Sequence, residues 1–259
     1  MRVSDVISAI EAFAPLAIQE SWDNSGLLIG SPSDEVRGVM VGFDCTPGLI
    51  ERVLAAGCDM VVTHHPLIFG GLKSISREDP VGDAVIRAVR GGVAVYAAHT
   101  TADKVIAGVS GAMARRLGLQ DVRILEEEPG GNGLGTVGVF PEPLEADAAL
   151  ALVKERFGLR ILRASKPVAG KISRVAMCGG SGASLIGAAR RAGAQLYISA
   201  DISYHHFFTE EGFMIADIGH FESEVEITGI LFSEIQKNFP NFAVCIDPDL
   251  ANSNPINYI

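Results

Sequence analysis

The stretch LIERVLAAGCDMVVTHH, residues 49–65, joins a helical pattern to a strand pattern and decides the fold class. Its first half places apolar side chains at the spacing of one helix face and stops at Gly57. Its second half is a short apolar run of the kind that fills a buried strand, and the run ends in two histidines. A helix followed directly by such a strand is typical of an α/β fold with mainly parallel strands.

A second copy of this pattern lies 136 residues later in the chain, at LIGAARRAGAQLYISAD, residues 185–201. The two copies match in helix, glycine stop and strand when Gly57 is aligned with Gly193. The strand that follows each copy ends in a histidine with an acidic residue four positions later; the two pairs are His99 with Asp103 and His220 with Glu224. These coincident copies predict duplicated, interlinked α/β units with functional residues at the carboxyl ends of their strands.

The rest of the chain follows the same alternation of elements. The expected strands are 38–44, 59–65, 93–99, 174–180, 194–201 and 213–220, and the expected helices are 47–57, 79–92, 103–118, 146–158 and 184–193. Residues 126–147 are rich in Gly, Pro and acidic side chains and hold one expected short strand, so we place a crossing between units there. The predicted division is a first unit of residues 1–125 plus 219–259, which contains the metal ligands, and a second unit of residues 126–218, within one continuous module of residues 1–259.

The composition excludes several classes of protein. The chain has 259 residues, 48% of them hydrophobic, and its net charge of -10 with no dense Lys/Arg block makes nucleic acid an unfavourable partner. No segment approaches the roughly 20 apolar residues of a membrane span. Four distant cysteines without a C-x-x-C pair, and an N-terminal stretch unlike a signal peptide, indicate a cytoplasmic protein.

The adjacent His64 and His65 lie where their strand must end. Neighbouring strand residues point to opposite faces, and Pro66 turns the chain out of the sheet, so both rings can overhang its edge. Two divergent imidazoles suit two metal ions better than one, although an isolated pair is more often a hydrogen-bonded strand end. The wider set of candidate ligands lacks cysteine, which suits zinc, manganese, iron or cobalt, and it consists of His64, His65, His99, Asp103, His220 and Glu224.

Three further segments each have two interpretations. CGGSGAS (178–184) could bind a phosphate on its backbone N–H groups, but it lacks the lysine of a P-loop, and a glycine turn is favoured. Asp44 could orient a metal ligand or form a turn before Pro47. WDNSG (22–26) could reach the site or form an ordinary turn anchored by Trp22.

The ordered motifs WDNSGLLIG (22–30), VVTHHPLIF (61–69), AAHTTAD (97–103) and DIGHFESE (217–224) make the whole chain resemble the GTP cyclohydrolase I type 2 homologue family, also called Nif-three-like. The resemblance implies a homohexameric toroid with a dinuclear metal site in each subunit. It implies that the metal ligands are His64, His65, Asp103, His220 and Glu224, with Glu224 bridging the ions. His99 is then a further ligand or a group that orients one.

The expected activity follows from this ligand set. Two divalent ions, two carboxylates and a bridging hydroxide leave a charge of about +1, which favours a small anionic substrate such as a nucleotide. The resemblance implies that the hydroxide attacks the purine ring of GTP. In this chain the expected acid or base residues are His99, Asp201 and His205, and the alternative for Asp201 and His205 is an ordinary surface pair. Hydrolysis of a phosphoester or a cyclic amide would use the same ions. The alternative from another class is a non-catalytic metal-binding ring scaffold or regulatory protein.

Overall fold

The computed structural model describes residues 1–259 and divides into two compact units. Unit 1 comprises Met1–Ala102 and Ile227–Pro255, and unit 2 comprises Asp103–Glu226 and Ile256–Ile259. None of the helices combines the length and the apolar composition that a membrane span needs.

The chain crosses between the units at 102–103 and 226–227, whereas the crossings expected from the sequence are 125–126 and 218–219. The first difference arises because α5 (Val109–Leu117) packs on the sheet of unit 2 and β5 (Gln120–Glu127) pairs within it. The second arises because α8 (His220–Glu224) packs on strands of the same sheet. The Asp103, His220 and Glu224 side chains therefore belong to unit 2, and not to the first unit as expected.

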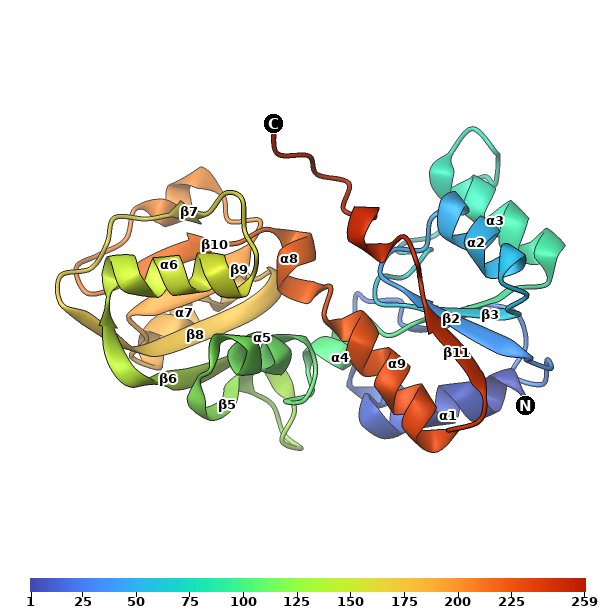
Figure 1. Ribbon diagram of the computed structural model, residues 1–259, viewed down its shortest axis with the longest axis horizontal. Coiled ribbons are helices and arrows are strands. Elements are labelled where there is room, and N and C mark those ends of the chain that lie inside the picture. Colours follow the sequence, from blue (N-terminus) through green and yellow to red (C-terminus); the bar gives the residue numbers. More distant parts are fainter. The chain divides into compact units, whose positions relative to one another are not determined.

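The sheet of unit 1 has the strand order β1-β4-β3-β2-β11, in which only the edge strand β1 runs antiparallel to its neighbour. Its strands are β1 (Gly26–Ile29), β2 (Gly38–Gly42), β3 (Met60–Thr63), β4 (Ala94–Ala97) and β11 (Ala243–Ile246). Helices α2 (Pro47–Ala55) and α3 (Pro80–Gly91) cover one face, and α1 (Val3–Phe13) and α9 (Ile227–Asn238) lie on the other (Figure 1).

Local sequence explains how α2 begins and what it buries. The Thr46 hydroxyl accepts a hydrogen bond from the Leu49 N–H at 3.1 Å, and Pro47 occupies the first turn, where its missing N–H costs nothing. Leu49 and Val53 then pack in one buried cluster with side chains from β2, β3, β4 and α3. This apolar contact packs α2 against β3, the strand that His64 and His65 follow.

The sheet of unit 2 has the strand order β5-β6-β8-β9-β10-β7. Its remaining strands are β6 (Gly133–Glu145), β7 (Arg163–Ala164), β8 (Lys171–Ser181), β9 (Leu196–Ala200) and β10 (Met214–Asp217). Helices α5 and α6 (Ala146–Arg156) lie on one face, and α7 (Ile186–Arg191) lies on the other (Figure 1). Side chains of β8 alternate between the faces, since Val175 and Met177 join the α5–α6 cluster whereas Ala176 and Cys178 join the α7 cluster.

The same four-strand pattern occurs in both sheets. In unit 1, β2, β3 and β4 are parallel and β1 lies antiparallel beside β4. In unit 2, β8, β9 and β10 are parallel and β7 lies antiparallel beside β10. Helix α2 joins β2 to β3 as α7 joins β8 to β9. The α/β fold class with duplicated units is confirmed, and the second sheet adds the antiparallel strands β5 and β6.

Two short helices follow the corresponding strands of the two repeats. Helix α4 (Thr100–Asp103) begins three residues after β4, and α8 begins three residues after β10. The single helix expected at 103–118 is wrong, because α4 ends at Asp103 and α5 begins only at Val109. Gly108 precedes α5 with an extended backbone (φ -82°, ψ -145°), which interrupts the helical path. The remaining turns are the 3₁₀ segments Leu16–Ile18, Ala183–Leu185, Tyr204–Phe207 and Leu250–Asn252.

Candidate metal centre

The adjacent histidines follow β3 as the sequence predicts, and the local backbone brings their rings to one side. The Thr63 hydroxyl donates to the His65 carbonyl at 2.8 Å, and the backbone N–H groups of His64 and His65 both donate to the Phe43 carbonyl at 3.2 Å. The ring centroids of the two histidines lie 4.8 Å apart at an interplanar angle of 47°. The strand therefore ends at Thr63, before His64, so the alternation of side chains between the two faces of a sheet does not apply to His64 and His65.

His99 joins this pair from the neighbouring strand of unit 1. It follows β4, and its ring centroid lies 5.4 Å from that of His64 and 5.4 Å from that of His65. One ring nitrogen from each of the three histidines lies within 4.8 Å of the other two. Three imidazoles at this spacing form a nitrogen donor set of the kind that binds zinc and similar divalent ions.

The three rings are held in the same way, because each Nδ1 lies at hydrogen-bond distance from an oxygen that can only accept. The partners are the Ala98 carbonyl for His64 at 2.9 Å, the Asp44 carboxylate for His65 at 2.7 Å and the Asp23 carboxylate for His99 at 2.7 Å. Each Nδ1 therefore donates, and a neutral ring then has its lone pair on Nε2. Metal-ligating histidines typically have this arrangement, in which the second nitrogen is fixed by an acceptor.

Asp23 is the most firmly held of these acceptors. Its side chain is 0% exposed, and its second oxygen accepts hydrogen bonds from the Ser25 hydroxyl at 2.7 Å, the Thr100 N–H at 3.1 Å and the Thr100 hydroxyl at 2.5 Å. Burial acts to raise the pKa of Asp23, but the hydrogen bonds from His99, Thr100 and Ser25 hold that pKa well below its usual range. The WDNSG segment thus reaches His99 with a charged carboxylate.

In unit 2, the Glu224 carboxylate has His220 and Asp103 as neighbours. Nε2 of His220 lies 3.0 Å from a Glu224 oxygen, and an oxygen of Asp103 lies within 4.8 Å of an oxygen of Glu224. Glu224 is only 4% exposed. Two carboxylates this close repel each other in a buried setting, and a cation between them offsets the repulsion. The three side chains therefore form a second donor set of mixed nitrogen and oxygen type.

The orientation of His220 repeats that of the histidines in unit 1. Its Nδ1 lies 2.7 Å from an oxygen of Asp201, which directly follows β9. Asp201 has a left-handed backbone with φ 54°, which few residues other than glycine adopt. Such strain is concentrated at functional sites, and here it accompanies the hydrogen bond to a candidate ligand. The structure thus assigns to Asp201 a contact with His220.

Gly179 and Gly180 of CGGSGAS lie at the end of β8, packed closely against α8. Gly180 has φ +60°, and a Cβ atom there would lie closer than 3.0 Å to the Glu224 carboxylate. The Gly180 N–H donates to the Ser223 hydroxyl at 2.9 Å, which links the end of β8 to α8. A glycine at this position therefore makes room for Glu224. The glycine turn favoured from the sequence is not found at Gly179 and Gly180, because β8 continues to Ser181.

The remaining predicted residue, His205, lies apart from these contacts. It is exposed in the 3₁₀ turn Tyr204–Phe207, and its ring packs against Tyr204 and Phe208 at centroid distances of 5.4 and 6.4 Å. Its role as an acid or base stays a prediction. Conversely, the support of His99 by Asp23 is not visible in the sequence, since 76 residues separate the two and no spacing rule connects them.

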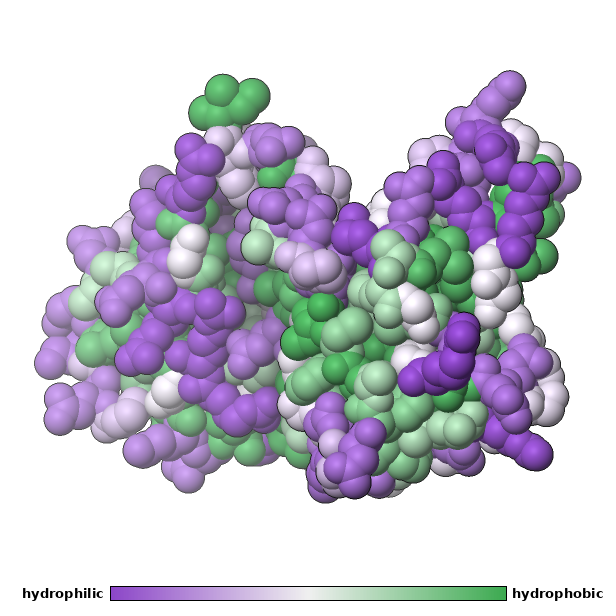
Figure 2. All heavy atoms as spheres, turned by 45° about the vertical axis from the view of Figure 1, so that its right-hand side comes forward, coloured by the Kyte–Doolittle hydropathy of each residue, from purple (hydrophilic) through white to green (hydrophobic).

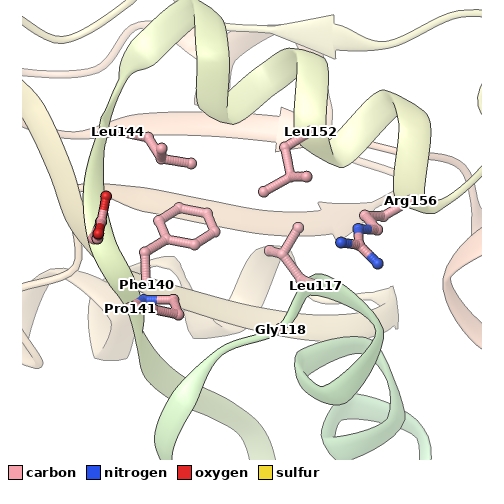
Figure 3. Close-up of a pocket in the computed structure, with 8 residues that line it drawn as sticks. Leu117, Gly118, Phe140, Pro141, Leu144, Leu152 and Arg156 are labelled. Atoms are coloured by element: carbon pink, nitrogen blue, oxygen red, sulfur yellow. The ribbon is translucent and has the colours of Figure 1, made fainter.

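A pocket of about 480 Å³ in unit 2 differs in character from the candidate metal centre. Leu117, Phe140, Leu144 and Leu152 point into it, and the Arg156 guanidinium lies at one side (Figure 3). None of the candidate ligands lines it. Its apolar wall offers no donor set for a metal ion, so the candidate centre consists of the two sets described above.

Comparison with known proteins places the chain in a family. It matches the model of Duf34/NIF3 (NGG1p interacting factor 3) over residues 1–251. A relative from Clostridium perfringens, named "GTP cyclohydrolase 1 type 2 homolog", is 31% identical over 228 residues, which is 86% of this chain and 87% of that protein. A relative of the same name from Streptococcus pneumoniae is 31% identical with 100% of both chains covered.

Solved structures agree with this at the level of the fold. A Bacillus cereus protein related to NIF3 has a TM-score of 0.91 and 20% sequence identity, with 100% of this chain and 99% of that chain covered. The resemblance predicted from the ordered motifs is therefore confirmed. Because the family model spans nearly the whole sequence and relatives with more than 30% identity cover most of it, this protein is a member of the Duf34/NIF3 family.

Proposed function

We propose that the protein is a metal-dependent hydrolase in which both donor sets take part in binding two divalent ions. The observation that supports this best is the shared orientation of four histidines, each of which has its Nδ1 on an acceptor oxygen. These histidines are His64, His65, His99 and His220. This arrangement is the one typical of metal-ligating histidines, and in His220 Nε2 also lies 3.0 Å from the Glu224 carboxylate.

The proposed ligands are His64, His65, Asp103, His220 and Glu224. Their chemistry fits zinc, iron(II), manganese or cobalt, since neutral imidazoles and carboxylates serve all of these ions. Glu224 has two oxygens with which to bridge, and its nearness to Asp103 and His220 supports that role. Bound divalent ions would supply Lewis acidity and a nucleophilic water at neutral pH.

The remaining polar residues have distinct proposed tasks. His99 either adds a ligand or exchanges a proton with the substrate, and its fixed Nδ1 leaves Nε2 as the nitrogen for either task. Asp201 is a positioning residue, because it contacts His220. His205, on an exposed turn, is the proposed acid or base that meets the substrate from solvent.

The proposed substrate is a small anionic molecule, and GTP is the first candidate because relatives have the printed name "GTP cyclohydrolase 1 type 2 homolog". In that case the reaction opens the purine ring by hydrolysis. A phosphoester is the second candidate, since the same donor sets suit it. The competing function is a metal-binding scaffold or regulatory protein without catalysis. It predicts bound metal but no turnover of nucleotides or phosphoesters.

We also propose that the protein assembles with copies of itself, as a homohexameric ring, and that it acts in the cytoplasm. Hydrophobic side chains gather in one broad area of the face drawn in Figure 2, amid largely hydrophilic surroundings. Tyr204 and Phe208 are also large exposed apolar side chains. Exposed apolar area of this kind supports self-association, which sedimentation of the purified chain measures.

The experiment that tests the metal proposal compares wild type with Glu224→Gln and Glu226→Gln, purified without a chelating tag. Glutamine keeps the volume that packs against Gly180 but removes the charge. Glu226 lies two residues further on and is exposed, so it is the matched control. We expect about two ions per chain in wild type and in Glu226→Gln, and loss of at least one in Glu224→Gln.

Activity is then measured with the metal identified, on a panel of GTP, other nucleotides and generic phosphoesters. Hydrolysis that depends on Glu224 supports an enzyme, and the identity of the hydrolysed compound chooses between the two substrate classes. Wild-type protein that contains no metal and takes up none when zinc, manganese or iron(II) is added would refute the proposal. Full metal content without any hydrolysis would favour the scaffold.

A further inference from the structure

Trp22 and Phe69 form an exposed aromatic surface beside His99 in unit 1. Their ring centroids are 5.9 Å apart at 35°, and each ring meets His99 edge-on, at 6.0 Å for Trp22 and 5.8 Å for Phe69. Trp22 is 57% exposed and Phe69 is 54% exposed. Metal binding by the proposed ligands does not require the Trp22 or the Phe69 ring, although both rings contact His99 of the nitrogen donor set.

Neighbouring residues fix this aromatic pair in place. The Asn24 amide donates to the Ile68 carbonyl at 2.5 Å, which joins the segment of Trp22 to that of Phe69. The Asn24 N–H donates to Asp23 at 2.7 Å, and the Asp23 side chain is wholly buried. The backbone that carries both rings is therefore anchored. A ligand that covers the rings causes little further ordering of the protein, so the entropic cost of binding is small.

We propose that the Trp22–Phe69 pair binds the planar heteroaromatic ring of the substrate and thereby selects for such rings. This inference rests on the proposed function, because it assigns the substrate class of the same site. The two centroids are too close to admit a third ring, which would need about 7 Å, or two stacking distances of about 3.5 Å. The ligand ring therefore lies across the exposed faces of the pair.

The contact with His99 places the aromatic surface beside the nitrogen donor set. A ring stacked on the pair lies next to the donor set of His64, His65 and His99. A substrate whose reacting atom belongs to the ring is thus placed for hydrolysis, whereas a simple phosphoester gains nothing from the aromatic surface. The pair consequently favours the ring-opening candidate over the phosphoester.

The chain has a single tryptophan, so the fluorescence of Trp22 reports directly on this surface. The metal-loaded full chain is excited at the red edge of tryptophan absorption and titrated with guanosine, with GTP and with ribose 5-phosphate. We expect saturable quenching by guanosine and GTP and none by ribose 5-phosphate, which lacks the ring. Absence of quenching by both guanosine and GTP would overturn the proposal.

Two variants make the test specific. Phe69→Leu removes one ring, and we expect its affinity for guanosine to fall about tenfold or more. Ile75→Ala trims another apolar side chain of the same loop, 55% exposed in the structure, and should bind guanosine like wild type. Equal affinities in the two variants would contradict a role for the pair. Trp22→Leu has no tryptophan, so its affinity for guanosine is measured by calorimetry; it should fall as in Phe69→Leu.

The metal content of every sample separates this inference from the proposed function. Chains that take up no added zinc, manganese or iron(II) but still show guanosine quenching refute the metal proposal and leave the aromatic surface intact. Metal-loaded, hydrolytically active chains whose turnover and guanosine affinity are unchanged by Phe69→Leu refute the surface alone. A Trp22 emission that changes with protein concentration in parallel with sedimentation would show that a second copy covers the pair, which also overturns the inference.

Discussion

Asp23 and His99 lie 76 residues apart in the chain, and the Asp23 carboxylate accepts a 2.7 Å hydrogen bond from Nδ1 of His99. Because the Asp23 side chain is wholly buried and receives four further hydrogen bonds, it has no freedom to turn away. The orientation of a candidate ligand is therefore set by a loop near the start of the sequence.

Asp23→Asn should weaken metal binding about 10- to 100-fold, because the loss of a carboxylate behind a ligating histidine has this effect. The amide also brings N–H donors against the Ser25 and Thr100 donors, which should lower the free energy of unfolding by about 1–3 kcal/mol. Competition with a chelator measures the first effect and urea unfolding the second. Asp44→Asn, at a partly exposed partner of His65, should cost less stability. Equal losses in both variants would show that burial of Asp23 is unimportant.

Asp201→Gly should reduce metal affinity while leaving the free energy of unfolding almost unchanged. Glycine relieves the left-handed backbone at φ 54° but adds unfolded-state entropy, so the free energy of unfolding should change by less than about 1 kcal/mol. The hydrogen bond to His220 is lost, and metal affinity should fall about 10- to 100-fold. Asp121→Gly is the matched control, since Asp121 has φ 50° and is exposed. An Asp121→Gly variant that also loses metal would discredit the assignment of Asp201.

Gly180→Ala should be far more damaging than Gly57→Ala, although both glycines have positive φ, at +60° and +70°. At Gly57 a Cβ meets nothing within 4 Å, so alanine there costs only the backbone strain of about 1–2 kcal/mol. At Gly180 the Cβ also collides with the Glu224 carboxylate. We expect a larger loss of stability together with reduced metal content, measured by unfolding and elemental analysis. Identical behaviour of the two variants would rule out the close contact.

The buried thiols should react slowly at ordinary pH. Burial raises the pKa of Cys45 to about 12, and burial together with nearby Cys245 raises the pKa of Cys58 to about 11. Since the thiolate is the nucleophile and a free cysteine has a pKa of about 8.5, the thiolate fraction of both residues at pH 8 is far below that of an exposed cysteine. Alkylation rates, followed by peptide mass spectrometry, should increase with pH up to about 11–12 and be normal in denaturant. A rate that levels off near pH 9 in native protein would contradict this.

The parts of the fold that the sequence predicts are those encoded locally. The helix, glycine stop and strand around Gly57 recur around Gly193 and give both repeats, and the histidines after their strands follow from the same pattern. The one short strand expected within residues 126–147 is β6, which spans 13 residues although it contains Pro141 and Pro143. The structure retains the strand, because its pairing with β8 shifts register between Val139 and Leu144, where missing N–H donors do little harm.

The parts that the sequence does not predict depend on contacts between distant segments. The partners of the histidine Nδ1 atoms come from loops whose spacing varies freely, so neither Asp23 nor Asp44 could be assigned to its histidine from the sequence. The same holds for β11, a run of four residues that becomes a strand only through its pairing with β2. The local sequence pattern thus identifies candidate ligands, whereas the groups that orient these ligands can be identified only from the folded structure.

The pairing of β11 with β2 also bears on how the protein is made. It pairs Cys245 with Met40, 205 residues earlier in the chain, so during synthesis the edge of β2 has no neighbouring strand until almost all of these residues have emerged from the ribosome. An open strand edge in a nascent chain invites aggregation and binding by chaperones. Residues 103–226 of unit 2 are continuous and can complete their sheet earlier. The half of the molecule with His64, His65 and His99 is therefore begun first in synthesis and finished last in folding.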